Sequence, residues 1–331
     1  MSRVAVLGAG SWGTALAVHL ARNGHQARLW GRDRELVARM RDERRNAAFL
    51  PDIRFPEAVT PTAHLDECMD AAAYVVTAVP SHGLRAVIRQ AAPLIPAGAT
   101  LVSATKGIEP GTLRRMSQVI EEETAHSGRV AVISGPSFAA EVARQLPTAL
   151  SVACSDGRAA TAVQQDFRGP SLRLYVTDDV VGVEVGGAAK NVIAIAAGVV
   201  DGLELGHNAK AALITRGLVE IARLACALGA RRDTLAGLSG LGDLVLTCTG
   251  ELSRNRHVGV ELGRGRPIDE ILSGMRMVAE GVRTTHAALA LGAQHGVELP
   301  ITSQMAAVLD GRRGPLAAVE QLMLRPPKAE H

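Results

Sequence analysis

Aromatic residues are scarce in this chain of 331 residues: two Trp, two Tyr and four Phe make up 2% of it. The hydrophobic core must therefore be built from Ala, Val, Leu and Ile. Hydrophobic residues make up 47% and charged residues 21%, which is typical of a globular protein and excludes an intrinsically disordered chain. The chain is too long for one typical core, so its length predicts two domains.

A large excess of charge of one sign is also lacking. The net charge is +3, whereas a nucleic-acid-binding protein would usually carry a larger and clustered excess of Lys and Arg. The basic run from Arg41 to Arg45 is interrupted by Asp42 and Glu43, a pattern typical of a solvated helix face. We therefore expect no nucleic-acid partner.

Closely spaced cysteines and metal-ligand spacings are absent from the sequence. The four cysteines lie far apart, without a C-x-x-C pair, which argues against a disulfide framework or a zinc site: Cys68, Cys154, Cys226 and Cys248. The ten histidines include no H-x-x-x-H spacing. We predict reduced thiols, no metal and a cytoplasmic protein.

The sequence also lacks a targeting segment and a typical membrane span. The first apolar run, Val4 to Leu7, stops at Gly8 and is too short for the core of a signal peptide. The longest apolar stretch, Val180 to Val200, contains Glu184 and Lys190. Charges inside such a run predict a buried core helix with a paired or functional residue, not a membrane span.

Short apolar runs alternate with helical patterns over the first half of the chain. The apolar runs predict strands that are covered on both faces: Val4–Leu7, Ala27–Trp30, Ala73–Val79, Thr100–Ser103, Val130–Ile133 and Ala149–Ala153. Apolar residues at helical spacing lie between them, at Thr14–Asn23, Gly83–Leu94 and Thr112–Glu123. This alternation predicts an α/β domain over residues 1–183, built on a doubly wound parallel sheet of the Rossmann type.

The pattern becomes helical in the second half, where few runs resemble strands. Helical periodicity covers Val185–Leu203, Ala209–Leu228, Ile268–Ser273, Thr284–His295, Ile301–Leu309 and Pro315–Leu322. We therefore predict a second, all-α domain over residues 184–331.

The segment Gly8-Ala-Gly10-Ser-Trp-Gly13 lies between the first predicted strand and the first predicted helix. In that context Gly8 permits a tight turn, Gly10 lets the backbone approach a pyrophosphate, and Gly13 allows close packing of helix on strand. The helix N-terminus adds free N–H groups and a partial positive charge. The segment therefore predicts dinucleotide binding.

The end of the second predicted strand bears on the choice of nicotinamide cofactor. An acidic residue there would hold the ribose 2′-hydroxyl of NAD, but the strand ends in Trp30-Gly31-Arg32. A guanidinium instead suits a 2′-phosphate. NADP(H) is therefore favoured, with Arg32 as the residue that recognises it, while the neighbouring Asp33 keeps NAD(H) possible.

Lys190 is the most unusual residue of the second half, because an otherwise apolar helix must bury or nearly bury its ammonium. Burial lowers the pKa of a lysine, so that it could exchange a proton with a substrate oxygen near neutral pH. A lysine that reaches the helix surface is the alternative. Asp243 could lie beside it and hold it. Ser253-Arg254-Asn255-Arg256 would suit a phosphate, although a solvated loop could carry the same residues.

Two further segments follow predicted strands. Ser134–Glu141 comes after Val130–Ile133, and Lys106-Gly107 comes after Thr100–Ser103. Both should lie at the carboxyl edge of the sheet, where open α/β folds bind ligands. Neither segment identifies a substrate by itself.

Together these segments resemble the bacterial type of NAD(P)-dependent glycerol-3-phosphate dehydrogenase. The resemblance covers nearly the whole chain and is specific only as a combination: Gly8–Ala15, Ala104–Ile108, Ser134–Glu141, Lys190-Asn191, Leu241–Cys248, Ser253–Arg256 and Glu280-Gly281. It implies reversible reduction of dihydroxyacetone phosphate to sn-glycerol 3-phosphate, which feeds phospholipid synthesis. It also implies that Lys190 is the proton donor and acceptor at the C2 oxygen of the substrate.

The same resemblance assigns binding roles to residues of both halves. It implies substrate contacts at Lys106, Gly135, Ser137, Lys190, Asp243, Ser253, Arg254 and Asn255. It implies cofactor contacts at Ser11, Trp12, Arg32, Lys106, Ala139, Arg254, Val278 and Glu280. With the apolar faces of the helical domain, it also favours a homodimer.

Two other functions remain open from the sequence. A β-hydroxyacid dehydrogenase of the 6-phosphogluconate or hydroxyisobutyrate type would share the two domains and a catalytic lysine followed by Asn. Such enzymes resemble the chain less at Ser253–Arg256 and Leu241–Asp243. A catalytically silent NADPH-binding protein is the alternative from another class, and the presence of Lys190, Asp243 and Arg254 argues against it.

Overall fold

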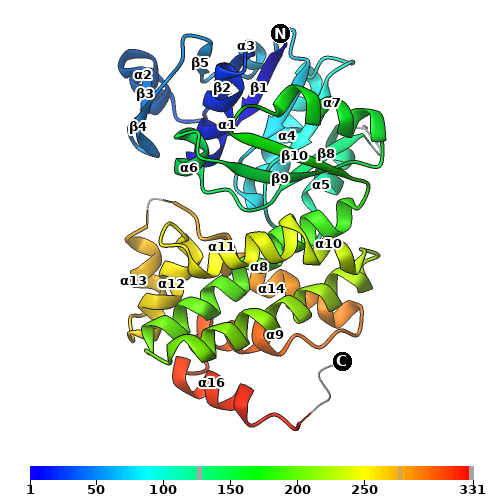
Figure 1. The fold of residues 1–331 in the computed structure, drawn as a ribbon. Helices are drawn as coiled ribbons and strands as arrows, with labels where there is room; N and C mark the ends of the chain where they lie inside the picture. Colours follow the sequence, from blue (N-terminus) through cyan, green and yellow to red (C-terminus); the bar gives the residue numbers. More distant parts are fainter. Residues whose placement is uncertain (125–128, 276, 328–331) are drawn as a thin grey trace. The chain divides into compact units, whose positions relative to one another are not determined.

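The computed structural model describes residues 1–124, 129–275 and 277–327, which form two compact units. The first unit comprises Met1–Glu109 and Arg114–Glu184, and the second comprises Pro110–Leu113 and Val185–His331. The first is α/β and the second is helical (Figure 1). The predicted fold class is therefore confirmed.

An eight-stranded sheet forms the centre of the first unit, in the order β10-β9-β8-β7-β6-β1-β2-β5. Its strands are β1 (Arg3–Leu7), β2 (Gln26–Trp30), β5 (Val59–Thr62), β6 (Tyr74–Thr77), β7 (Thr100–Ser103), β8 (Val130–Ser134), β9 (Thr148–Ala153) and β10 (Leu172–Thr177). The six predicted strands are present, and the two edge strands were not predicted. The sheet is parallel except between β8 and β9, so the predicted parallel sheet is confirmed apart from this one antiparallel pair.

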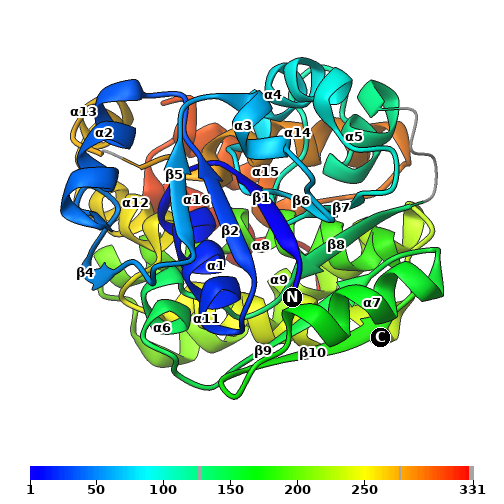
Figure 2. The ribbon, with the colours of Figure 1, turned by 90° about the horizontal axis from the view of Figure 1, so that it is seen from above.

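The side chains of β1 alternate between the two faces of the sheet, as a strand that is covered on both sides requires. Val4 and Val6 belong to one hydrophobic cluster, and Ala5 and Leu7 belong to another. The helices of this unit are α1 (Ser11–Arg22), α2 (Arg34–Glu43), α3 (Leu65–Met69), α4 (Leu84–Ala91), α5 (Met116–Thr124), α6 (Ala139–Ala143) and α7 (Gly157–Phe167) (Figure 2). Residues of α1, α2 and α7 join the first cluster, and residues of α3, α4 and α5 join the second.

Shorter elements complete the first unit. A two-stranded antiparallel hairpin, β3 (Arg45–Asn46) and β4 (Leu50–Arg54), follows α2. The 3₁₀ turns η1 (Ser81–Gly83) and η2 (Ala92–Leu94) flank α4, so the predicted helix Gly83–Leu94 is divided into three pieces.

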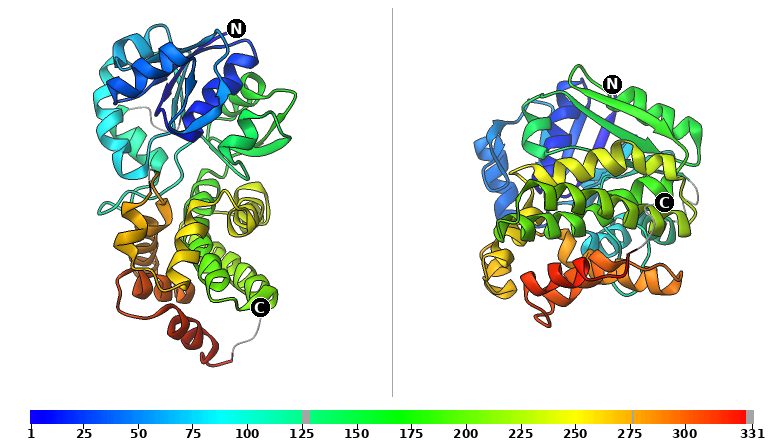
Figure 3. Two further views of the ribbon diagram at one scale, coloured as in Figure 1. Left: turned by 90° about the vertical axis from the view of Figure 1, so that its left-hand side faces the viewer. Right: turned by 60° about the horizontal axis from the view of Figure 1, so that its bottom comes forward.

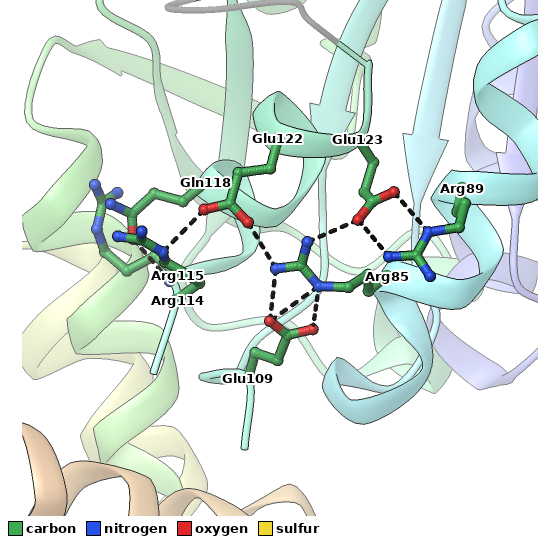
Figure 4. Close-up of polar contacts among 8 residues, drawn as sticks. All are labelled: Arg85, Arg89, Glu109, Arg114, Arg115, Gln118, Glu122 and Glu123. Atoms are coloured by element: carbon green, nitrogen blue, oxygen red, sulfur yellow. Dashed lines mark hydrogen bonds and ion pairs between the residues drawn. The ribbon is translucent and has the colours of Figure 1, made fainter. Parts of the chain in front are cut away.

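The loop after β7 differs from its prediction, because the helix expected from Thr112 begins only at Met116. The Glu109 N–H donates to the Arg114 carbonyl oxygen at 2.9 Å and closes the loop instead. Arg85 of α4 fastens it by pairing with Glu109 at 2.8 Å (Figure 4). The same guanidinium also binds two carboxylates of α5, Glu122 and Glu123, each at 2.7 Å. The loop that begins with Lys106 is thus fixed by a network of ion pairs.

The second unit consists of helices packed side by side, with α16 at its edge (Figure 3). They are α8 (Val180–Gly202), α9 (Gly206–Ala227), α10 (Arg232–Ala236), the π turn η3 (Leu238–Gly242), α11 (Asp243–Thr249), α12 (Arg254–Gly263), α13 (Ile268–Ser273), α14 (Glu280–Gln294), α15 (Pro300–Leu309) and α16 (Pro315–Met323). The helices predicted from periodicity are present, within a few residues at their ends. The segments from α10 to α12 were not predicted.

Helix α8 is the buried core helix that its sequence predicted. By length and composition alone it could cross a membrane, but 89% of its most apolar window is buried inside the structure. Its charged residues are all paired, since Glu184 binds Arg115 at 2.5 Å, Lys190 binds Asp243 at 2.5 Å and Asp201 binds Arg256 at 2.7 Å. The prediction of a buried helix with paired charges is confirmed.

Helices α8 and α12 approach each other at two pairs of glycines, Gly198 and Gly202 against Gly259 and Gly263. A methyl group on Gly259 would lie 1.9 Å from the Ile195 carbonyl oxygen. Only glycine therefore permits this crossing, which fixes the start of α12, where Ser253–Asn255 lie, relative to α8.

Candidate active site

The glycine-rich segment lies at a topological switch point of the sheet. Strand β1 is flanked by β2 on one side and β6 on the other, so the chain crosses over β1 between β5 and β6. Open α/β sheets bind ligands at the carboxyl ends of strands beside such a point. Gly8 follows β1 there, and its N–H donates to the Trp30 carbonyl oxygen of β2 at 3.0 Å.

Each glycine of the segment meets a different steric demand. Gly8 has φ +117°, and a methyl group on it would lie 2.7 Å from the Ala78 carbonyl oxygen. A methyl group on Gly13 would lie 1.9 Å from the Gly8 carbonyl oxygen. At Gly10 nothing lies within 4 Å of that position, so the backbone is open to a ligand.

The start of α1 is suited to an anion. The helix begins at Ser11 after Gly10, its first turn contains no acidic residue, and no side chain caps it. The N–H groups and the positive end of the helix dipole are therefore available to phosphate oxygens. The indole Nε1 of Trp12 is buried without a hydrogen-bond partner among the described residues. These observations fit a bound dinucleotide pyrophosphate.

Arg32 and Asp33 follow β2, and only the Asp33 side chain caps a helix. Asp33 is the N-cap of α2, where its Oδ1 accepts from the Leu36 N–H at 3.0 Å. Arg32 is exposed and directly follows Gly31, which packs against Ala9 of the glycine-rich segment. Since capping occupies the Asp33 carboxylate, Arg32 is the better placed of the two for a ribose substituent.

Three predicted substrate residues of the first unit meet at one carbonyl group. The Gly135 oxygen accepts from Lys106 Nζ at 2.8 Å and from Ser137 Oγ at 2.9 Å. Gly135 has φ +140°, a conformation that favours glycine. Lys106 follows β7 and Gly135 follows β8, so the cluster lies at the carboxyl ends of these strands.

Lys190 is buried in the second unit, with 6% of its surface exposed. Its Nζ donates to Asp243 Oδ1 at 2.5 Å and to Thr247 Oγ1 at 2.8 Å. The Asp243 side chain is 1% exposed, so the ion pair is almost completely removed from solvent. Thr247 was not singled out from the sequence, although its position four residues after Asp243 places both on one face of α11. Burial raises the pKa of the adjacent Cys248 thiol to about 12, so this thiol is neutral at pH 7.

The amides of Asn191 and Asn255 connect α8 with α12 and α14. Asn255 Nδ2 donates to Asn191 Oδ1 at 2.9 Å, and Asn255 Oδ1 accepts from the Gly281 N–H at 2.9 Å. The link passes from Asn191, next to Lys190, to Gly281, next to Glu280. The sequence did not reveal this connection, because its members lie 64 and 26 residues apart.

The first residues of α12 divide into a cap and an exposed cation. Ser253 is the N-cap, and its Oγ accepts from the Arg256 N–H at 3.2 Å. Arg256 pairs with Asp201 of α8 at 2.7 Å. Arg254 is exposed and forms no ion pair with any residue in the described ranges. Arg254 is thus the side chain of this group that remains for an anionic ligand.

The remaining predicted cofactor residues lie at helix starts. Ala139 begins α6 in the first unit, Val278 is half-buried shortly before α14, and Glu280 begins α14. Within residues 1–124, 129–275 and 277–327, no group of three or more His, Cys, Asp or Glu side chains could hold a metal ion.

Comparisons with known proteins identify the same family along the chain. Residues 3–160 match the model of the NAD-dependent glycerol-3-phosphate dehydrogenase N-terminus, and residues 179–320 match that of its C-terminus. A glycerol-3-phosphate dehydrogenase [NAD(P)+] of Koribacter versatilis is 54% identical, covering 100% of this chain and 99% of the relative. The one of Acidobacterium capsulatum is 52% identical, with 100% of both chains covered.

Solved structures agree as well. The crystal structure of glycerol-3-phosphate dehydrogenase from Coxiella burnetii has a TM-score of 0.94 and 42% identity, covering 98% of this chain and 99% of that one. D-mandelate dehydrogenase, at 13% identity and a TM-score of 0.66, shares the fold alone. The chain belongs to the NAD-dependent glycerol-3-phosphate dehydrogenase family.

Proposed function

We propose that this protein reversibly reduces dihydroxyacetone phosphate to sn-glycerol 3-phosphate with NAD(P)H. The observation that carries the proposal is the buried Lys190, held by Asp243 and Thr247 in a chain of this family. An ammonium that is buried and paired in this way suits proton transfer to an alkoxide oxygen.

The residues around Lys190 supply the polar part of the reaction. A bound nicotinamide supplies the hydride to the carbonyl carbon of the substrate. Negative charge then grows on the C2 oxygen, where the Lys190 ammonium stabilises it and donates a proton. Asp243 and Thr247 keep Nζ in one orientation, so little reorganisation is needed during the reaction. In the reverse direction Lys190 accepts the proton.

The substrate phosphate provides binding energy away from the reacting carbon. We assign it to Arg254, the exposed guanidinium at the start of α12, with support from Ser253 and Asn255. Asn255 uses one Nδ2 hydrogen for Asn191, and the other is assigned to the phosphate. Lys106, Gly135 and Ser137 are the proposed substrate contacts of the first unit. Such contacts convert remote binding energy into orientation of the carbonyl group.

We assign dinucleotide binding to a domain of residues 1–183 and substrate binding and catalysis to a helical domain of residues 184–331, with additional contacts to each ligand from the other domain. Gly8, Gly10 and Gly13 shape the pyrophosphate site, with Ser11 and Trp12 at the start of α1. NADP(H) is favoured over NAD(H) because Asp33 is occupied as a helix cap and Arg32 is not. Further proposed cofactor contacts are Lys106, Ala139, Arg254, Val278 and Glu280.

The cellular setting follows from the proposed reaction. Its product is a precursor of glycerophospholipids, and we place the enzyme in the cytoplasm. We further propose a homodimer, formed through apolar faces of the helical unit.

The deciding experiment is the loss of nicotinamide absorbance with dihydroxyacetone phosphate, measured side by side with NADPH and NADH. We expect rapid oxidation by the wild type and none by Lys190→Ala, which should still bind NADPH. Arg32→Ala should lower the preference for NADPH over NADH. Turnover of a β-hydroxy acid with none of dihydroxyacetone phosphate would select the hydroxyacid dehydrogenase alternative. Binding of NADPH without any turnover would select the silent binding protein.

A further inference from the structure

The β3–β4 hairpin holds the glycine-rich segment at two points. Ser11 Oγ donates to the Phe49 carbonyl oxygen at 2.9 Å, and Asn46 Nδ2 donates to the Ala9 carbonyl oxygen at 2.8 Å. Asn46 is the last residue of β3 and Phe49 lies in the turn before β4, and they are 37 and 38 residues away from their partners in the sequence. Neither was identified as a functional residue from the sequence.

Asn46 is completely buried, and the two polar atoms of its carboxamide differ in their hydrogen bonds. Its Nδ2 donates to Ala9 O and, at 2.9 Å, to Thr14 Oγ1, whereas Oδ1 has no hydrogen-bond partner in the described part of the chain. The Ala9 carbonyl oxygen only accepts, which fixes Nδ2 on that side. Burying an unpaired acceptor costs free energy. Packing alone therefore does not explain why an amide occupies this position. The two hydrogen bonds that Nδ2 donates explain it.

The bond to Ala9 O controls the direction of a neighbouring N–H group. The Ala9 carbonyl and the Gly10 N–H belong to one planar peptide, in which a trans C=O and N–H point in opposite directions. With the oxygen held toward Asn46, the Gly10 N–H points away from it. The space beside Gly10 is open, since nothing lies within 4 Å of the position of an added methyl group.

We propose that Asn46 is a positioning residue for the dinucleotide, because it aims the Gly10 N–H at the pyrophosphate. This inference rests on the proposed binding of NAD(P)H to the first unit. Asn46 touches neither cofactor nor substrate. It acts through the Ala9–Gly10 peptide, while its bond to Thr14 keeps the first turn of α1 in register with the loop.

The test replaces the amide with an acid of nearly the same shape. In Asn46→Asp the ionised carboxylate cannot donate to Ala9 O, so the NADPH dissociation constant and the KM for NADPH should rise about tenfold at about pH 8. The kcat and the KM for dihydroxyacetone phosphate should stay within about twofold of the wild type. As the pH falls toward about 6, a buried carboxyl regains its proton and can donate again. The ratio of the variant and wild-type dissociation constants should then shrink toward one.

Two further variants separate this effect from a general loss of structure. Asn23→Asp is the matched control, since Asn23 Nδ2 contacts His19 Nε2 at the other end of α1, at 2.9 Å. It should leave NADPH binding unchanged. Asn46→Ser lacks the reach of the amide and gains no donor at low pH, so it should bind NADPH about tenfold more weakly at every pH. It also serves as the test if Asn46→Asp does not fold.

The outcomes distinguish this inference from the proposed function. A wild-type protein that does not bind NADPH would overturn the function itself. Wild-type binding with unchanged binding by both Asn46 variants would overturn only the role of Asn46. A rise in both KM values and a fall in kcat that pH does not reverse would mean that Asn46 supports the fold and not the pyrophosphate site.

Discussion

Lys190→Met keeps most of the length of the side chain but removes its ammonium. The Asp243 carboxylate then loses its partner at 2.5 Å while its side chain is only 1% exposed. Water cannot replace the lysine without opening the contact between α8 and α11. We therefore expect this substitution to reduce the stability of the second unit as well as to abolish turnover.

The magnitude follows from the burial of the pair. Removing one partner of a buried ion pair costs about 3–5 kcal/mol, because the other charge stays uncompensated. For a unit of this size, 1 kcal/mol corresponds to roughly 2–4 °C in Tm, so the midpoint should fall by about 10 °C. Lys190→Met/Asp243→Asn removes both charges and should be more stable than the sum of the two single losses predicts, by about 1–3 kcal/mol.

Scanning calorimetry is the suitable assay, because two units need not unfold in a single two-state transition. Arg312→Met is the control, since Arg312 pairs with Asp310 at 2.7 Å but its side chain is 66% exposed. Its loss should cost less than about 1 kcal/mol. If Lys190→Met proved as stable as this control, the interpretation of Lys190–Asp243 as a desolvated ion pair would be refuted.

Three other changes test separate parts of the structure. Arg254→Ala should raise the KM for dihydroxyacetone phosphate by about tenfold or more, since a charge-assisted bond to phosphate is lost; an unchanged KM would argue against the phosphate role. Gly259→Ala should lower stability by about 1–3 kcal/mol in thermal unfolding, because the new methyl group meets the Ile195 carbonyl oxygen; wild-type stability would show that the helices move apart freely. Hydrogen bonds from Arg89 and Arg85 lower the pKa of Glu123 from 4.5 to about 2. That contribution to stability is present above pH 4.5 and is lost as the pH falls toward 2, so acid unfolding of Arg89→Met should depend less on pH over this interval.

Much of the first unit could be predicted because its signals are local. The strand, the glycine-rich turn and the helix follow one another directly, and each glycine answers a demand of its own backbone. Lys190 was conspicuous for a similar reason, as a charge inside an apolar helix. The structure places Asp243 beside it, at 2.5 Å from its Nζ, as the sequence predicts.

The elements that the sequence did not predict lack such local signals. Strand β5 contains Pro61, and a proline in a short run argues against a strand because it cannot donate a backbone hydrogen bond to a neighbour. Pro61 is tolerated here because β5 lies at the edge of the sheet. Strand β10 is the other edge and alternates between buried and exposed residues, so it is not a continuous apolar run. The antiparallel pairing of β8 with β9 could not be predicted, because the amino-acid composition of the two strands does not depend on their relative direction. The helix predicted from Thr112 starts late because Arg114 and Arg115 are engaged in the loop and its ion pairs.

The site residues divide in the same way, and the division has a physical cause. The glycines and Lys190 can be recognised from the sequence, because backbone freedom and charge are properties of the residue itself. Asn46 was not predicted as a site residue, and Asn255 was predicted only as a substrate contact, because their hydrogen-bond partners lie 37 and 64 residues away and a carboxamide looks the same on a surface as in a core. Both are buried, both donate from Nδ2, and both act on the backbone or side chain of another segment. A change from Asn to Asp, mild by composition, would replace a donor with a buried negative charge at either position. The largest effects of mild substitutions are therefore expected at these two asparagines, in residues that carry no reacting group.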